Sequence, residues 1–476
     1  MIDLTCENCT KMARSASRLL TTILLMVAFC ALLTAMFTPS AKAYGEVRKA
    51  DIIAGSTVEQ RDIPVASCPS VDAEYAVLVD SEGTVLFERN GDTPAQIASI
   101  TKVMTAIVAI DNAREGTVIT VSEKAASIGE SSASLAEGDV LDFETALKAL
   151  LVPSGNDAAQ ALAETVGAQI IENDPSMGSD PVAAFVAMMN RKANEIGCEN
   201  TVYENPHGLD DGEYAGSLHS TAKDQAKVAK SAMEYDAIRK IVGAGDTTIS
   251  VERDGKKENI KLESTDGLLE MYDEAIGVKT GVTDLAGPSF MGAANKDNRE
   301  LYSVVLDSTD EHQRFEDTKN LFMWAYDHVR DLKLANSEVT ATTSLGGQAH
   351  DVPVIASVSH SDWIDETVDA TLADPEASIS VFDLEGNVSQ SITFDELHGT
   401  IHEGDKVGSV VFKQRNMVVA EQDLVACETV EAPNPLETMS IWWMRLVGGI
   451  QGEPAQAESL IYNVMPVISN NVSNAA

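Results

Sequence analysis

The sequence predicts an α/β (α+β) domain, followed by a small all-β domain and a C-terminal amphipathic helix. Helical and strand periodicities alternate from about residue 99 to residue 330, after a strand hairpin. Short runs of Thr, Val, Ser and Ile dominate residues 338–432. An apolar stripe at helical spacing covers residues 434–450. A chain of 476 residues has room for about three such units.

The first unit, predicted over residues 71–335, opens with two strands. Tyr75–Asp80 and Val85–Arg89 are apolar runs joined by Ser81-Glu82-Gly83, which is a hairpin pattern. Further along, the periodicity predicts helices over 183–196, 221–233 and 312–329, and strands over 247–263 and 301–306. The two periods alternate in this stretch with no internal repeat, which is typical of a mixed α/β domain.

The C-terminal helix has a clear start signal. Asn434 can cap it, Pro435 suits the first helical position, and Glu437 completes a capping box. Its apolar stripe favours a helix that lies in a membrane interface as a candidate anchor. The alternative is a helix docked on the β domain, because only Arg445 is basic there. The stripe consists of Leu436, Met439, Trp443, Leu446 and Ile450, with Trp442 and Val447 beside it, and residues 451–476 then predict a tail.

The first 43 residues predict a signal peptide. Lys11, Arg14 and Arg18 precede an apolar run over 19–37, and Ala41-Lys42-Ala43 offers a cleavage site. An uncleaved anchor is the alternative, because the apolar run approaches the length that spans a bilayer. Residues 44–70 predict a linker. The rest of the chain is expected to be exported and associated with the cell membrane or the cell wall.

Composition narrows the function classes. The chain has 34 basic and 74 acidic residues, a net charge of −40, and such a field disfavours nucleic-acid binding because it repels phosphates. Three of the six cysteines fall in the leader, and the remaining three, Cys68, Cys198 and Cys427, are too few and too far apart for a disulfide scaffold. These three cysteines can form at most one disulfide bridge. The eight histidines have no metal-ligand spacing, so no metal site is predicted.

Three short motifs carry the chemistry. The first, Ser99-Ile100-Thr101-Lys102, opens a helical pattern and places a lysine amine one turn from a serine hydroxyl. A serine nucleophile needs an adjacent base, and a lysine can serve when burial and a second cation lower its pKa. The second motif is Ser154-Gly155-Asn156, and the third is Lys279-Thr280-Gly281.

The order of the three motifs makes the signal specific. A second Ser-x-x-Lys runs from Ser220 to Lys223, and a second Ser-x-Asn covers 469–471. Neither can replace the first two motifs, because Lys-Thr-Gly occurs once, at 279–281, and no Ser-x-Asn lies between Ser220 and that motif. Ser220 is therefore expected to cap a helix, and His207 to lie in a buried turn. The ordered set is the one found in penicillin-binding proteins and class A β-lactamases.

With its neighbouring stretches, the chain resembles a low-molecular-mass penicillin-binding protein of the D-alanyl-D-alanine carboxypeptidase family. The stretches are 98–102, 154–159, 205–209, 219–222 and 277–287, within about residues 70–330. The resemblance implies a serine β-lactamase/penicillin-binding-protein-like transpeptidase fold for residues 71–335. It also implies removal of the terminal D-alanine from peptidoglycan stem peptides, inhibition by β-lactams, and no metal or organic cofactor.

The resemblance also implies a role for each motif residue. Ser99 attacks the penultimate D-alanine carbonyl and Lys102 takes its proton. Ser154 relays a proton to the leaving amine, and Asn156 holds the substrate amide. Lys279 and Thr280 bind the terminal carboxylate, and Gly281 lets the substrate approach the edge strand. The backbone N–H groups of Ser99 and Val282 form the oxyanion hole.

Two other functions compete with this one. A β-lactamase would share the nucleophile, but class A members carry a Glu-x-x-Leu-Asn run that does not occur between Asn156 and Lys279. A non-catalytic penicillin-binding or wall-binding sensor would have no need of Lys102 or Lys279, and both are present. Endopeptidase action on cross-links also stays open.

Overall fold

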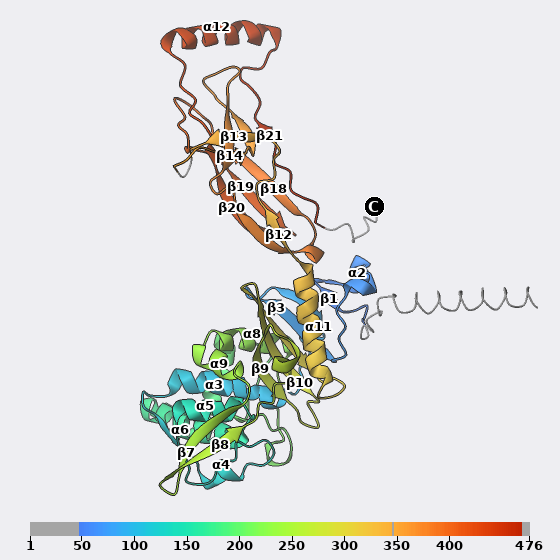
Figure 1. Ribbon diagram of the computed structural model, residues 1–476, viewed down its shortest axis with the longest axis vertical. Helices are drawn as coiled ribbons and strands as arrows, with labels where there is room; N and C mark the ends of the chain where they lie inside the picture. The colour runs from blue at the N-terminus through green and yellow to red at the C-terminus, as the bar shows by residue number, and fades with distance from the viewer. Residues whose placement is uncertain (1–46, 345–346, 469–476) are drawn as a thin grey trace, which may run out of the picture. The chain divides into compact units, whose positions relative to one another are not determined.

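The computed structural model describes residues 47–344 and 347–468 of the chain (Figure 1). The predicted signal peptide, with Cys6, Cys9 and Cys30, lies outside the described residues, and so does the second Ser-x-Asn motif at 469–471. The thiols of Cys68, Cys198 and Cys427 are free and buried, so none of these three cysteines takes part in a disulfide.

An antiparallel sheet forms the centre of the first domain. Its strand order is β2-β1-β4-β3-β11-β10-β9, which places β9 at one edge. The hairpin of β3 and β4 has the predicted bounds, because its apolar side chains pack into the cores on the two faces of the sheet. The strands are β1 (Ile52–Ile53), β2 (Ser56–Thr57), β3 (Tyr75–Asp80), β4 (Val85–Arg89), β9 (Ala275–Gly281), β10 (Ser289–Lys296) and β11 (Arg299–Leu306).

Both faces of this sheet are covered. Ala76 and Leu78 of β3 belong to a core shared with α11 (Gln313–His328), whereas Val77 and Val79 belong to a core shared with α3 (Thr101–Asn112) and α8 (Ala222–Met233). Figure 1 shows α11 along one side of the sheet and the helical lobe on the other. Because alternate side chains enter different cores, β3 is an unbroken apolar run.

The helical lobe positions the first two motifs. Every residue of α3 from Thr101 to Ala109 is buried, and α3 packs against α5, α6, α7 and α8. A helix enclosed in this way is a rigid support for the serine turn that precedes it. The lobe comprises η2 (Ala98–Ile100), α3, α4 (Glu123–Ser127), α5 (Phe143–Leu151), α6 (Asn156–Asn173), α7 (Pro181–Glu195) and α9 (Asp236–Val242), with a sheet of β5 (Val118–Thr120), β6 (Val140–Asp142), β7 (Thr247–Arg253) and β8 (Lys256–Leu262). The short helix α10 (Leu268–Met271) packs instead against β9 and α11.

The second domain is all-β, as its composition predicts. Its main sheet has the order β18-β19-β20-β16-β15-β21 around a core that includes Val358, Val410 and Phe412. The strands are β12 (Val329–Lys333), β13 (Thr340–Thr343), β14 (His350–Pro353), β15 (Ala356–Ser359), β16 (Thr367–Leu372), β17 (Ser378–Phe382), β18 (Val388–Phe394), β19 (Lys406–Gln414), β20 (Met417–Ala426) and β21 (Leu460–Ile461).

The C-terminal helix α12 (Pro435–Gln451) begins as predicted. Asn434 Oδ1 accepts hydrogen bonds from the backbone N–H groups of Leu436 and Glu437, and the Glu437 carboxylate accepts one from the backbone N–H of Asn434. The predicted apolar stripe is exposed, because only Ile441 and Gly448 of this helix are buried. Among the residues that the structure describes, none of the helices combines the length and hydropathy needed to cross a bilayer.

Three parts of the chain differ from the sequence expectation. The linker predicted over 44–70 contains folded structure: β1, β2 and α2 (Val58–Arg61) join the first domain, and Asp51 forms a buried ion pair with Arg89 at 2.7 Å. The tail predicted over 451–476 includes β21, which pairs with β15. Helix α8 is capped by Thr221 rather than by Ser220. Each difference depends on pairing between distant residues or on a shift of one position, which local patterns do not resolve.

Candidate active site

The first motif forms a tight serine–lysine pair. Ser99 lies in the short turn η2, and Lys102 follows one turn later in α3, so both side chains lie on one face. Lys102 Nζ is 2.7 Å from Ser99 Oγ and donates a hydrogen bond to the carbonyl of His207 at 2.8 Å. The amine is held between a hydroxyl and a carbonyl, and no carboxylate is among its hydrogen-bond partners in the described part of the chain.

The surroundings of Lys102 favour a neutral amine. Its side chain is fully buried, and burial lowers its pKa well below the usual range, with the charge of Lys279 lowering it further. Asp157 and Glu130 act in the opposite direction but are weaker. A buried, uncharged amine at hydrogen-bond distance from a serine hydroxyl can accept its proton.

The second motif places two polar groups beside this pair. Ser154 is 3% exposed, its backbone has φ +65°, and its Oγ has no hydrogen-bond partner among the described residues. Asn156, the first residue of α6, donates from Nδ2 to the carbonyl of Gly129 at 2.9 Å, while its Oδ1 has no partner in the described part of the chain. Buried polar atoms are normally satisfied, so these two are candidates for binding a substrate.

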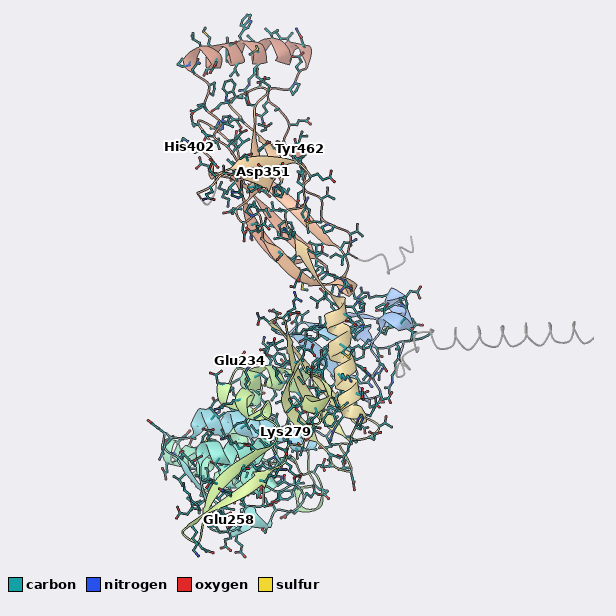
Figure 2. All side chains as sticks on the ribbon, in the orientation of Figure 1. Glu234, Glu258, Lys279, Asp351, His402 and Tyr462 are labelled. Atoms are coloured by element: carbon teal, nitrogen blue, oxygen red, sulfur yellow. The ribbon has the colours of Figure 1, made fainter. Side chains whose placement is uncertain are left out.

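The third motif ends the edge strand β9. Lys279, which is labelled in Figure 2, is 1% exposed. It donates from Nζ to the carbonyl of Thr280 at 3.0 Å. Thr280 Oγ1 lies 2.7 Å from Thr265 Oγ1. Burial lowers the pKa of Lys279 to about 7, and the guanidinium of Arg314 lowers it as well, whereas Asp266 raises it.

Gly281 and Val282 lie next to the serine turn. A Cβ on Gly281 would be 2.8 Å from the carbonyl oxygen of Ile97, so the glycine is needed first for packing β9 against η2. The substrate clearance expected at Gly281 stays a prediction, because packing alone already requires a glycine here. Val282 follows directly and lines the same cavity as Ser99, with a side chain that is 46% exposed.

The three motifs meet at one cavity of about 280 Å³. Ser99, Ser154, Thr280, Gly281 and Val282 line it, whereas Lys102, Asn156 and Lys279 are buried and do not. The remaining lining residues are Glu130, Ser131, Gly208, Leu209, Thr265, Thr283, Glu311 and Arg314. Segments more than a hundred residues apart in the sequence therefore contribute to the same space.

The sequence analysis missed the charged residues of this site, which include Glu130 and Glu311 in the cavity lining as well as Arg314 and Asp266. Arg314 is 5% exposed, lines the cavity and donates to the carbonyl of Gly281 at 3.3 Å. The sequence does carry a signal for Arg314, because this charged residue shares a helical face of α11 with the buried Leu321 and Ala325. Asp266 is 8% exposed, and burial raises its pKa to about 6. No local motif marks Asp266.

The other residues considered in the sequence analysis make contacts that suit a structural role. Ser220 bonds to Thr201 at 2.7 Å, and Lys223 forms ion pairs with Glu88 and Asp92. His207 is a buried turn residue whose pKa is lowered to about 3, mainly by burial. Within residues 47–344 and 347–468, no group of three or more His, Cys, Asp or Glu is placed to hold a metal ion.

Comparisons with known proteins point in one direction. Residues 62–310 match the family model described as D-alanyl-D-alanine carboxypeptidase (Peptidase_S11). The chain is similar to D-alanyl-D-alanine carboxypeptidase DacF of Bacillus subtilis (strain 168), with 28% identity over 372 residues that cover 76% of this chain and 86% of the relative. It is also similar to DacC of Escherichia coli (strain K12), with 27% identity over 381 residues and coverage of 76% and 85%.

A solved structure agrees with these relatives. The crystal structure of the Streptomyces K15 DD-transpeptidase aligns with a TM-score of 0.50 at 29% identity, covering 54% of this chain and 98% of that one. The likeness to a DD-transpeptidase extends over about half of the chain, which is consistent with a first domain of that fold.

Proposed function

The chain belongs to the D-alanyl-D-alanine carboxypeptidase family, and on that premise we propose that Ser99 carries the reaction as an acyl-enzyme nucleophile. The protein is a serine-type D-Ala-D-Ala carboxypeptidase. Its substrate is a peptidoglycan stem peptide ending in D-Ala-D-Ala, and β-lactams, which resemble that end, are its inhibitors.

Acylation begins with the serine–lysine pair. With Lys102 neutral, the Ser99 hydroxyl donates its hydrogen bond to the amine across 2.7 Å. As Ser99 Oγ attacks the carbonyl carbon of the penultimate D-alanine, its proton passes to Lys102. The backbone N–H groups of Ser99 and Val282 stabilise the developing oxyanion, and one such donor is worth about 100- to 1000-fold in rate.

Departure of D-alanine needs a proton on its nitrogen. Ser154 Oγ is buried without a partner among the described residues, so its hydroxyl can accept a proton from Lys102 and donate its own to the leaving amine. The Oδ1 of Asn156, unpartnered within the same part of the chain, can accept from the amide N–H of the acyl part of the substrate. Water then attacks the ester, with Lys102 again as the base, and releases the shortened peptide.

The terminal carboxylate is the recognition element of a carboxypeptidase substrate. Thr280 and Arg314 line the cavity on the side of β9, and Lys279 lies beside Thr280. Two cations and a hydroxyl fit one carboxylate, since planar guanidinium groups bind carboxylates with two parallel hydrogen bonds. We assign Arg314 to this role together with Lys279 and Thr280.

One observation carries this assignment: the fully buried Lys102 amine at 2.7 Å from Ser99 Oγ. The test combines mass spectrometry after penicillin exposure with release of D-alanine from diacetyl-Lys-D-Ala-D-Ala. We expect a single adduct on Ser99 and loss of both activities in Ser99→Ala. An adduct on another residue, or D-alanine release by Ser99→Ala, would overturn the assignment.

Two further assays separate the competing functions. With nitrocefin, we expect a burst of one equivalent per enzyme, since a carboxypeptidase releases the acyl group slowly. Continuous turnover would favour a β-lactamase. Penicillin labelling of Ser99 without D-alanine release would favour a sensor.

The exposed stripe of α12 supports a peripheral membrane contact. Leu436 is 74% exposed, Trp442 62% and Ile450 82%, so the helix presents apolar side chains that its own domain does not cover. Paired tryptophans on such a helix suit the membrane interface. Truncation after Pro433 should move the exported protein from the membrane fraction to the soluble fraction. Equal retention of the full-length and truncated forms in fractionated cells would refute this contact.

A further inference from the structure

Glu130 has an unusual backbone at the edge of the active-site cavity. Its φ is +65°, a conformation that side chains other than glycine rarely adopt. Its neighbours are fixed by the second motif: the carbonyl of Gly129 accepts from Asn156 Nδ2 and the carbonyl of Ser131 accepts from the Asn156 backbone N–H, both at 2.9 Å. The strained residue is therefore held in place from both sides, which is typical of a functional position.

The turn after Glu130 is fixed equally well. The buried carboxylate of Asp157 accepts hydrogen bonds from the hydroxyl of Ser132 at 2.6 Å and from the backbone N–H of Ala133 at 3.0 Å. Because these contacts hold the loop against α6, the position of Glu130 is set by its neighbours in the loop.

Within the described residues, the carboxylate of Glu130 forms no ion pair. Among residues 47–344 and 347–468, Glu130 has no hydrogen-bond or ion-pair partner, although it lines the same cavity as Ser99 and Ser154. The other acid in the lining, Glu311, is paired with Arg314 at 3.2 Å. Glu130 is thus the lining acid that leaves a negative charge open to a ligand.

The direction in which the peptide lies in the cavity determines which part of the substrate is nearest to the Glu130 carboxylate. With the terminal carboxylate at Thr280 and Arg314, the acyl part of the peptide runs the other way, past Ser99 toward Asn156. Glu130 adjoins the two carbonyls that hold Asn156. The substrate residue that precedes D-Ala-D-Ala therefore passes nearest to Glu130.

We propose that Glu130 is a specificity residue that binds a positively charged side chain on the residue before D-Ala-D-Ala. This inference rests on the proposed function of Ser99 and names the substrate class that the site prefers. The preferred group is an ammonium with no carboxylate beside it, as on a lysine side chain. An unpaired carboxylate attracts such a cation and repels a side chain that carries its own carboxylate.

The test uses two peptides that differ in one charge. Nα-acetyl-Lys-D-Ala-D-Ala keeps a free ε-ammonium, whereas diacetyl-Lys-D-Ala-D-Ala does not, and the ratio of their kcat/KM values isolates the contribution of that charge. We expect the wild-type protein to favour the charged peptide about two- to fivefold at low salt, the range of an exposed ion pair. The preference should shrink at high salt because the ion pair is screened.

Variants show whether Glu130 is the source of the preference. Glu130→Gln should bring the ratio to about one, and Glu130→Lys should invert it. Glu130→Gly removes both the charge and the backbone strain, so it should also lose the preference while folding at least as stably. Glu137→Gln is the matched control: Glu137 is exposed and does not line the cavity, so the same change in net charge there should leave the ratio unchanged.

The outcomes are distinguishable. Equal hydrolysis of the two peptides by the wild-type protein, or an unchanged ratio in Glu130→Gln and Glu130→Gly, overturns the role of Glu130 and leaves the carboxypeptidase mechanism intact. Hydrolysis of neither peptide by the wild-type protein overturns the proposed mechanism, and this inference with it.

Discussion

The protonation of Lys279 should set the alkaline limit of the enzyme. Burial and the charge of Arg314 lower the pKa of Lys279 to about 7, and the amine binds a carboxylate only while it is protonated. The charged form exists below this pKa and is lost as the pH rises through it. Lys102 is assigned to the base rather than to the carboxylate, and burial moves its pKa well below the usual range.

The size of the effect follows from one titrating group. About half of Lys279 is protonated at pH 7 and about 1% at pH 9, so kcat/KM should fall by up to about 50-fold between these values, and by less where Arg314 still binds the carboxylate. The measurement is D-alanine release from diacetyl-Lys-D-Ala-D-Ala between about pH 6 and about pH 9.5 in a buffer of constant ionic strength. Because kcat/KM reports the free enzyme, the apparent pKa belongs to the empty site.

A change of substrate supplies the control. The same peptide with a C-terminal amide has no carboxylate, so its slower hydrolysis should show no fall between about pH 7 and about pH 9. An amide peptide that falls as steeply as the acid, or an acid peptide whose kcat/KM stays flat over this range, would refute the assignment of Lys279 to the carboxylate. This comparison needs no variant and therefore carries no risk of misfolding.

Three substitutions test other parts of the structure. Lys102→Met keeps the length of the side chain but removes the base, so penicillin acylation of Ser99 should slow by about 100- to 10,000-fold in a timed mass-spectrometric assay, and an unchanged rate would exclude Lys102 as the base. Gly281→Ala puts a Cβ 2.8 Å from the carbonyl oxygen of Ile97. The variant should lose about 1–3 kcal/mol of unfolding free energy in urea titrations, and its acylation should be slower. Wild-type stability and acylation would mean that β9 can move away from η2. Arg89→Met leaves the buried carboxylate of Asp51 without its partner and should cost about 3–5 kcal/mol in the same titrations; a loss below about 1 kcal/mol would contradict a tightly held N-terminal segment.

The sequence predicted the family and the mixed fold correctly, and the comparisons confirm both. The reason is that each motif is contiguous and combines side chains whose chemistry is specific. The hairpin of β3 and β4 was also predictable to the residue, because both strands are apolar runs with a turn between them.

Longer-range features escaped prediction for a physical reason. Strands β1 and β2 have two residues each, too short for a periodic signal, and they are ordered by the pairing of β1 with β4 and by the Asp51–Arg89 ion pair. Arg314 enters the site from α11, far along the chain from the third motif. Asp266 lies 13 residues before Lys279 in the sequence, and its charge affects the pKa of Lys279 because the fold brings the two residues together. These residues act through contacts that local patterns do not encode.

The backbone around the cleft has a further property that propensity cannot predict. Ala98, Glu130 and Ser154 have φ values of +46°, +65° and +65°, and they lie beside or within the groups assigned to the reaction. Each such conformation costs about 1–3 kcal/mol and persists only where surrounding structure enforces it. The enforcement here comes from the enclosed helix α3 and from the hydrogen bonds at the start of α6. Since these supports are buried, we infer that the strained residues hold the groups proposed as nucleophile, proton relay and specificity residue in place before the substrate arrives.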